Sequence, residues 1–359
     1  MEKILIVSPF KRDIHLYPHL HDFIALLAER FTVEYLAISE RGYFIKELFR
    51  PVSLLKVAKI FLGLHKFAGK KNRFQFIIAI DNLPYVLACL FIGGKVILFS
   101  HDFVSHDNPW RNAAAQKAIA RGTARCLEKN RKIIIQSTAR YDLLRKSLGP
   151  AKGTPPSPYY LPVSLRKIDP VRRQRPSGIP IVMQIGGINS FRSGSDRILA
   201  HYQSNASRYR LFFHGYVSAE LALQIRSCEF IPFSSSCITP PGSLHQIVAN
   251  CDIGFISYEG TDANFYHMAK SSGQLAEFLR MGKPVIATGR NDFSVYLEKE
   301  RIGIYIKDMN QFNEAIAEIV AHYEDYSSRC SELFEKEFVL NGYMPSLEAW
   351  IREDGQWTA

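Results

Sequence analysis

A glutamate and two serines lie close together near residue 275, at spacings that suit phosphate and sugar binding. Ser271 and Ser272 are favoured residue types at the start of a helix, and the open N-terminus of a helix attracts anions, phosphate above all. Glu277 follows about two turns into that helix. Its carboxylate is placed to accept hydrogen bonds from the two hydroxyls of a ribose. The alternative interpretation is an ordinary helix–strand unit with a capped helix and a surface glutamate.

A second group of polar residues follows a predicted strand in the first half of the chain. Residues 95–100 form an apolar strand that ends at His101 and Asp102, with His106 a few residues later. Because ligand chemistry in a parallel sheet collects at the carboxyl ends of the strands, we expect His101 to face a ligand-binding cleft, with Asp102 and His106 as further candidates. The alternative role for these residues is to cap the loop.

The loop after the first predicted strand carries three further polar candidates, Arg12, Asp13 and His15. They are candidates for contact with a ligand, and a solvated loop is the alternative. We expect no metal ion or other cofactor. The spacing of His15, His19 and His21 lacks a further ligand nearby, no Asp-x-Asp sequence occurs, and the cysteines show no ligand spacing.

Apolar runs of strand length alternate with helical patterns along the chain, which predicts an α/β fold. The helix that starts at Ser271 has Leu275, Phe278 and Leu279 at helical spacing, stops at Gly282 and leads into a short strand at 285–287. Eight prolines lie in residues 149–180, which indicates a connector there. The 359 residues are enough for two domains of ordinary size.

The stretch 271–287 resembles the donor-site signature of GT-B glycosyltransferases of the family 4 type. It begins at Ser271 and ends with Gly-Lys-Pro-Val-Ile-Ala at residues 282–287. The resemblance implies two facing Rossmann-like domains with a donor-binding cleft between them. We expect an acceptor-side domain at 1–162, a nucleotide-sugar-binding domain at 163–339, and a tail at 340–359 that packs back on the first domain. One departure is that Ala269 stands where the fuller signature has its first glutamate.

In this resemblance Glu277 binds the ribose of a nucleotide sugar, and backbone N–H groups at 271–273 together with Lys270 stabilise the leaving diphosphate. The resemblance also implies that His101, with His106 as the second choice and Asp102 beside it, is catalytic on the acceptor side, and that the loop with Arg12, Asp13 and His15 approaches an acceptor hydroxyl. Two glycines after the strand at 179–185 let the backbone approach the donor closely. The expected donor-binding residues are Gly186, Gly187, Arg192, His214, Ile231, Tyr258, Lys270, Ser271, Ser272, Gly273, Gln274 and Glu277.

The activity that the resemblance implies is transfer of a sugar, with retention, from a nucleoside diphosphate sugar to a glycan or lipid-linked acceptor in surface polysaccharide or glycoconjugate synthesis. The enzyme class that the resemblance implies is hexosyltransferase, EC 2.4. Two alternatives stay open. One is a nucleotide-sugar epimerase of the same fold, and the other is a non-enzymatic basic protein that binds membrane or nucleic acid. The chain shows no recognised nucleic-acid-binding motif, so we expect no nucleic-acid partner.

The positive charge of the chain is concentrated in its first half. The net charge is +11, but residues 1–150 alone carry 24 lysines and arginines against 12 acidic residues. A helix predicted after Pro51 places lysines on one stripe beside a wide apolar face, which suits an anionic membrane surface. These lysines are Lys56, Lys59, Lys66 and Lys70. The alternative is a helix packed on the sheet with its lysines in water.

We therefore expect a cytoplasmic protein that is peripheral on the cytoplasmic face of the membrane. The N-terminal apolar run is too short for a signal peptide, and no apolar run reaches the length of about 20 residues that a spanning helix needs.

Overall fold

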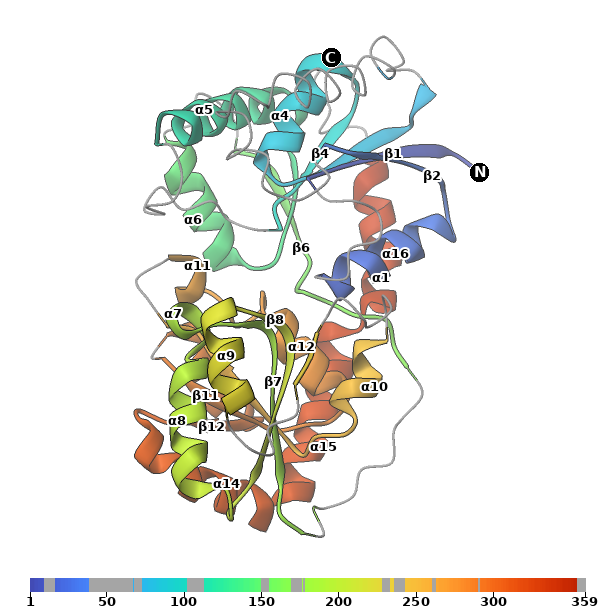
Figure 1. The fold of residues 1–359 in the computed structure, drawn as a ribbon. Coiled ribbons are helices and arrows are strands. Elements are labelled where there is room, and N and C mark those ends of the chain that lie inside the picture. Colours follow the sequence, from blue (N-terminus) through green and yellow to red (C-terminus); the bar gives the residue numbers. More distant parts are fainter. Residues whose placement is uncertain are drawn as a thin grey trace. The chain divides into compact units, whose positions relative to one another are not determined.

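The computed structural model describes residues 1–9, 17–38, 67, 73–101, 113–149, 155–168, 176, 178–227, 233–235, 243–259, 263–289 and 291–353. The contacts within it divide the chain into two compact units. The first contains residues 1–14, 23–162 and 342–359, and the second contains residues 15–22 and 163–341. Each unit is built on its own parallel sheet (Figure 1).

The described strands of the first unit form a six-stranded sheet in the order β2-β1-β3-β4-β5-β6, and every neighbouring pair is parallel. The strands are β1 (Lys3–Ser8), β2 (Thr32–Ala37), β3 (Phe76–Ile80), β4 (Val96–Phe99), β5 (Lys132–Ile135) and β6 (Ser157–Tyr160). The helices are α1 (Pro18–Ala28), whose first residues belong to the second unit, α4 (Asn82–Phe91), α5 (Ala113–Asn130), α6 (Thr138–Leu148) and α16 (Leu340–Arg352).

The described strands of the second unit form another six-stranded parallel sheet, in the order β12-β11-β10-β7-β8-β9. The strands are β7 (Ile181–Ile188), β8 (Arg210–Val217), β9 (Phe233–Ser235), β10 (Ile253–Ser257), β11 (Val285–Thr288) and β12 (Gly303–Tyr305). The chain builds outward from β7 to β9 and then returns to place β10 on the other side of β7. In such sheets ligands bind outside the carboxyl ends of the strands at this reversal.

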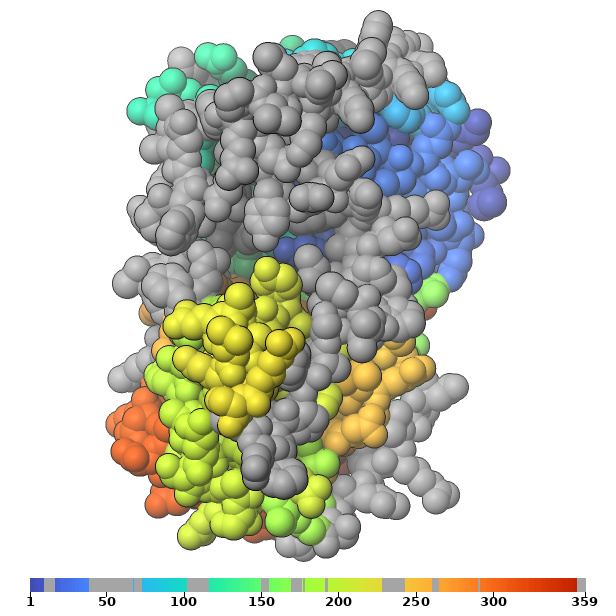
Figure 2. Space-filling model, viewed as in Figure 1, coloured from blue at the N-terminus to red at the C-terminus, as the bar shows by residue number. Residues whose placement is uncertain are grey.

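Helices cover both faces of the second sheet. One apolar cluster joins the sheet to α10 (Leu244–Val248), α12 (Gly273–Arg280), α13 (Asp292–Glu300), α15 (Tyr323–Leu333) and the π-helical turn η5 (Phe334–Phe338). Another joins it to α8 (Ser195–Asn205), α9 (Ala219–Ser227) and α14 (Phe312–Ala321). The short helices α7 (Ser190–Ser193), α11 (Ala263–Tyr266) and η4 (Met309–Gln311) complete the unit. Figure 2 shows α9, in yellow, at the surface, where Leu223 is exposed.

One apolar cluster of the first unit lies between its sheet and the helices α4, α5 and α6. Its C-terminal helix α16 is held through a fully buried lysine at the start of β5. The Lys132 ammonium donates to the backbone oxygens of Trp350, Ile351 and Glu353, at 3.0 Å for the last two. Three carbonyls at the end of a helix lack partners within the helix, so this ammonium satisfies them.

The sequence-based assignment of residues 149–180 to a connector is wrong at one place, because Ser157–Tyr160 forms β6 beside β5. This strand lies at the edge of the sheet, where a proline such as Pro158 is tolerated because its missing N–H costs no ladder hydrogen bond. None of the helices traced in the described residues combines the length and the apolar character that a membrane span requires.

Candidate functional site

Helix α12 begins at the carboxyl edge of the second sheet, because it precedes the parallel strand β11. Ser272 is its N-cap, and the Ser272 hydroxyl accepts from the backbone N–H of Leu275 at 2.9 Å. The Tyr258 hydroxyl is hydrogen-bonded to the same serine oxygen at 2.5 Å. Burial raises the pKa of Tyr258, so its hydroxyl keeps its proton at neutral pH. The helix start is therefore fixed by a side chain from the end of β10.

Glu277 is buried rather than exposed on the surface of this helix, with 1% of its surface accessible. One carboxylate oxygen, Oε2, accepts from the Arg280 guanidinium at 2.5 Å. The other, Oε1, has no hydrogen-bond partner among the described residues. Burial raises the pKa of Glu277, and the neighbouring Arg280 opposes that rise. A buried carboxylate oxygen without a donor is costly, and the hydroxyls of a ribose would supply donors.

Two residues that the sequence did not single out complete this group of charges. Arg280 lies one turn after Glu277, and its Nη1 atom is 3.7 Å from the Asp22 carboxylate of α1. Asp22 also accepts from the backbone N–H of Arg166 at 2.9 Å. The three-residue spacing from Glu277 to Arg280 is a visible helical signal for the first contact. No local pattern points to Asp22, which comes from the other end of the chain.

The predicted glycine pair lies at the end of β7, close to α12. The Gln274 side chain of α12 donates to the backbone oxygen of Ile185 at 2.7 Å. Gly186 has φ +90°, and a Cβ atom there would lie 2.7 Å from the Gln274 amide nitrogen. Gly186 pairs with Gly215 on β8, where a Cβ atom would collide with the Gly186 oxygen. Bare backbone is thus required here, and Gly186 and Gly187 are exposed.

His214, another predicted donor-site residue, is buried inside a strand. It lies within β8, next to Gly215, and is buried, which lowers its pKa and keeps the imidazole neutral. Gly273 is the first residue of α12. A Cβ atom at this position would lie 3.7 Å from Nδ1 of His19. The Ser271 hydroxyl is buried without a hydrogen-bond partner among the described residues.

A polar cluster that the sequence did not predict joins the carboxyl ends of β10 and β11. The Glu259 carboxylate accepts from Ser257 at 3.0 Å and from Thr288 at 2.9 Å, and it forms an ion pair with Arg197 of α8. Arg192 lies in α7, but its side chain is outside the described part of the chain, as is the whole of Ile231. Within the described part of the chain, Arg197 lies at this edge of the sheet through its ion pair with Glu259.

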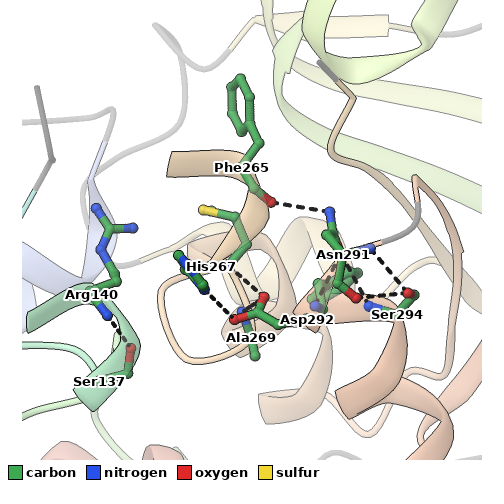
Figure 3. Close-up of polar contacts among 10 residues, drawn as sticks. Ser137, Arg140, Phe265, His267, Ala269, Asn291, Asp292 and Ser294 are labelled. Atoms are coloured by element: carbon green, nitrogen blue, oxygen red, sulfur yellow. Dashed lines mark hydrogen bonds and ion pairs between the residues drawn. The ribbon is translucent and has the colours of Figure 1, made fainter. Parts of the chain in front are cut away.

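The loop that leads into α12 is held by the first residues of α13 (Figure 3). Asn291 caps α13 and donates to the backbone oxygens of Tyr258 and Phe265 at 3.3 and 3.1 Å. Asp292 accepts from the N–H groups of Met268 and Ala269 and contacts His267 at 3.2 Å. Burial raises the pKa of Asp292, and His267 opposes that rise.

Lys270 follows this loop and is engaged in an ion pair. Its ammonium lies 2.9 Å from Glu337 of η5, which also accepts from the Tyr296 hydroxyl at 3.0 Å. Although partial burial raises the pKa of Glu337, the hydrogen bonds from Lys270 and Tyr296 bring it below the usual value. The predicted role of Lys270 at a diphosphate would therefore require this lysine to serve two partners or to exchange one for the other.

In the first unit, His101 lies at the carboxyl end of β4. Its backbone N–H donates to Asp81 at 3.0 Å, and its backbone oxygen accepts from Gln136 at 3.2 Å and from Arg140 at 3.5 Å. Arg140 in turn is fixed by Ser137, the N-cap of α6, as Figure 3 shows. Burial lowers the pKa of His101 to about 3, with a further contribution from Arg140. The imidazole is neutral at physiological pH.

The other sequence-predicted candidates lie outside the described residues. These are Arg12, Asp13 and His15, then Asp102 and His106, and the basic stripe Lys56, Lys59, Lys66 and Lys70. Among the residues that the structure does describe, no three His, Cys, Asp or Glu side chains gather as a metal site would require.

The fold has clear counterparts among solved structures, although no family model and no curated protein matches the sequence. Sucrose-phosphate synthase from Thermosynechococcus elongatus superposes with a TM-score of 0.70 at 14% identity, covering 98% of this chain and 99% of that one. WaaG, a glycosyltransferase involved in lipopolysaccharide biosynthesis, gives 0.66 at 13% identity over 99% and 100%. HepE from Anabaena, in complex with UDP-glucose, gives 0.65 at 14% identity over 98% and 99%. The chain therefore has the GT-B fold.

Proposed function

We propose that the protein is a glycosyltransferase that moves a sugar from a nucleoside diphosphate sugar to a hydroxyl of a glycan or a lipid-linked acceptor. The observation that carries this proposal is Glu277, a buried carboxylate on α12 with one oxygen held by Arg280 and the other without a partner in the described residues. Hydroxyl donors of a ribose would satisfy that oxygen. The complex of HepE with UDP-glucose supports a uridine nucleotide as the first donor to test.

In this proposal the start of α12 receives the diphosphate. As the glycosidic bond to the diphosphate breaks, negative charge develops on the leaving group, and backbone N–H groups at 271–273 stabilise it. The bare backbone at Gly186 and Gly187 admits a close approach to the donor. His101 acts on the acceptor side as a neutral imidazole, through a hydrogen bond to the reacting hydroxyl. We propose retention of the anomeric configuration, in keeping with family 4 enzymes.

We further propose that the protein works at an anionic membrane surface on the cytoplasmic side, on a lipid-linked acceptor of surface polysaccharide or glycoconjugate synthesis. The support is the charge distribution. Residues 1–150 carry a net charge of +12 and the remainder carries −1. A basic half attracts an anionic leaflet within a Debye length, about 8 Å at physiological salt.

A thermal-unfolding panel with UDP, GDP, ADP and their sugars tests the donor site. A ligand that binds the folded protein adds about 2.7 kcal/mol of stability at 100 times its dissociation constant. We expect one nucleotide and its sugars to raise the unfolding temperature while the other bases do not. Incubation with the stabilising donor should then release nucleoside diphosphate. An epimerised nucleotide sugar as the product would support the epimerase instead, and no shift with any nucleotide would refute the donor site.

A further inference from the structure

Three buried charged side chains meet at the second half of α12, which carries Glu277 and ends at Arg280. Arg280 lies between two carboxylates, 2.5 Å from Glu277 and 3.7 Å from Asp22. At most 6% of any of these three side chains is exposed. Removing one member of a buried ion pair leaves its partner uncompensated, so each member strongly affects the other two.

Arg280 and Asp22 have opposite effects on the ionisation of the Glu277 carboxylate. Burial disfavours the charged carboxylate, the cation of Arg280 favours it, and the negative charge of Asp22 disfavours it again. Arginine remains protonated in proteins, so Arg280 supplies a constant positive charge. On η5, which packs against α12, Glu337 is directed to Lys270 and Tyr296 instead. His19 of α1 lies by Gly273, at the start of α12 rather than at Glu277. His21 of α1 faces Asp22, with its Nδ1 atom 3.6 Å from the Asp22 carboxylate.

We propose that Arg280 is a positioning residue for the donor site and that Asp22 holds it there. Arg280 fixes one oxygen of Glu277, so that the other oxygen remains free and ionised to accept the ribose hydroxyls. Asp22 engages a second nitrogen of the same guanidinium, while the backbone N–H of Arg166 fixes Asp22 in turn. This inference rests on the proposed nucleotide-sugar site. It makes the first turn of α1 part of that site, although this segment is more than 250 residues away in the sequence.

The test is the pH dependence of UDP affinity, measured by calorimetry from pH 6.0 to 8.5 on the full-length protein. We expect Arg280→Gln to bind UDP at least tenfold more weakly than the wild type at pH 7. Its UDP affinity should rise again at least threefold, relative to the wild type, by pH 8.5. The reason is that burial favours the protonated form of Glu277 once the cation is gone, and a rise in pH restores the carboxylate. Asp22→Asn keeps an oxygen that can accept from Arg166 and Arg280 and removes only the negative charge, so it should shift the profile the opposite way and keep its affinity to lower pH than the wild type. The phosphates of UDP titrate alike with every protein, so only the difference from wild type is interpreted.

Two further variants separate positioning from general damage. Arg280→Lys keeps the charge and should retain the pH profile of the wild type, even if its affinity is lower. Arg226→Gln, an exposed arginine at the end of α9, should leave both the affinity and the profile unchanged.

Loss of affinity by the same factor at every pH in Arg280→Gln would overturn the inference, because a purely structural role predicts that result. If this variant fails to fold, Asp22→Asn decides alone, and an unshifted profile there refutes the positioning role. If the wild type binds UDP and every variant keeps the wild-type pH profile of UDP affinity, the positioning role is refuted and the proposed function stands. A wild type that binds no nucleotide contradicts both the inference and the proposed function.

Discussion

At the scale of single residues, burial acts on both proposed functional groups, and their neighbours decide the outcome. Burial favours the uncharged form of Glu277 and of His101 alike. Glu277 has Arg280 at 2.5 Å, which favours the carboxylate. His101 has Arg140 close to its backbone oxygen, and that positive charge disfavours the imidazolium further. The same fold thus supplies a buried carboxylate beside a cation and a neutral histidine.

Replacement of His101 should affect turnover more than donor binding. We expect His101→Ala to lower the rate of transfer at least about 100-fold, the loss typical of a removed acid–base or polar group. UDP affinity should stay within a few-fold of wild type. Because the pKa of His101 is lowered to about 3, the wild-type rate should show no histidine inflection between pH 5 and 8.

Steady-state rates of His101→Ala and His106→Ala, measured side by side, check this prediction. Loss of turnover in His106→Ala alone would move the role along the loop. An inflection near pH 6.5 that disappears in His101→Ala would show that the histidine titrates in the working enzyme and would contradict its neutral state.

Residues of the site were predictable where the signal is local. Ser272 caps α12 as its residue type and position indicated, and Glu277 lies on the predicted helix. Its deep burial was not predicted, because the helical pattern alone allowed a surface position. Asp22, Asp81 and Glu259 were missed, since each contacts its partners across segments that are distant in sequence.

At the scale of secondary-structure elements, Lys132 should be a main support of α16. We expect Lys132→Met to lower the free energy of unfolding by about 2–3 kcal/mol, because it leaves the helix carbonyls of Trp350, Ile351 and Glu353 without their charged donor. Urea unfolding followed by tryptophan fluorescence measures this change, since Trp350 contacts Lys132. Lys117→Met, an exposed position on α5, is the matched control. Equal midpoints for the two variants would contradict the prediction.

The contact between α12 and its sheet should be equally sensitive. A Cβ atom on Gly254 of β10 would lie 2.7 Å from the Phe278 ring, so Gly254→Ala must push α12 away from the strand. We expect a loss of about 1–3 kcal/mol in stability, the usual range for an overpacked core, and weaker UDP binding because Glu277 moves with the helix. Gly342→Ala in α16 meets no atom within 4 Å and should leave both quantities intact or improve stability. Calorimetry and urea unfolding of both variants check this. Wild-type affinity in Gly254→Ala would argue against a donor site on α12.

The elements themselves were largely readable from hydrophobic periodicity, with errors where tertiary context overrides local composition. The strands β1, β4, β10 and β11 follow continuous apolar runs, which is the pattern of a parallel sheet buried on both faces. The strand β6 was missed because its sequence, Ser-Pro-Tyr-Tyr, has the composition of a connector. Its pairing with β5 comes from its position at the sheet edge, which no local pattern reveals.

At the scale of the whole molecule, the uneven charge predicts where the protein binds. We expect co-sedimentation with vesicles that contain anionic lipid and little with neutral vesicles, because attraction to the basic half is electrostatic and weakens as salt rises. Combined replacement of Lys56, Lys59, Lys66 and Lys70 by glutamine should reduce the bound fraction clearly. A matched change of Lys299, Lys307 and Lys336, in the other half of the chain, should not. Wild-type protein that stays in the supernatant with anionic vesicles at low salt would refute the membrane proposal.

Glu277 should bind the nucleotide of a sugar donor, and titration with UDP by calorimetry is the decisive measurement. Glu277→Gln is the appropriate variant, because alanine would leave the buried Arg280 with an unfilled space and one partner fewer. We expect Glu277→Gln to lose at least tenfold in UDP affinity, about 1.4 kcal/mol, while its circular dichroism matches that of the wild type. Glu220→Gln on the exposed side of α9 should bind as the wild type does. Unchanged UDP affinity in Glu277→Gln would contradict the claim.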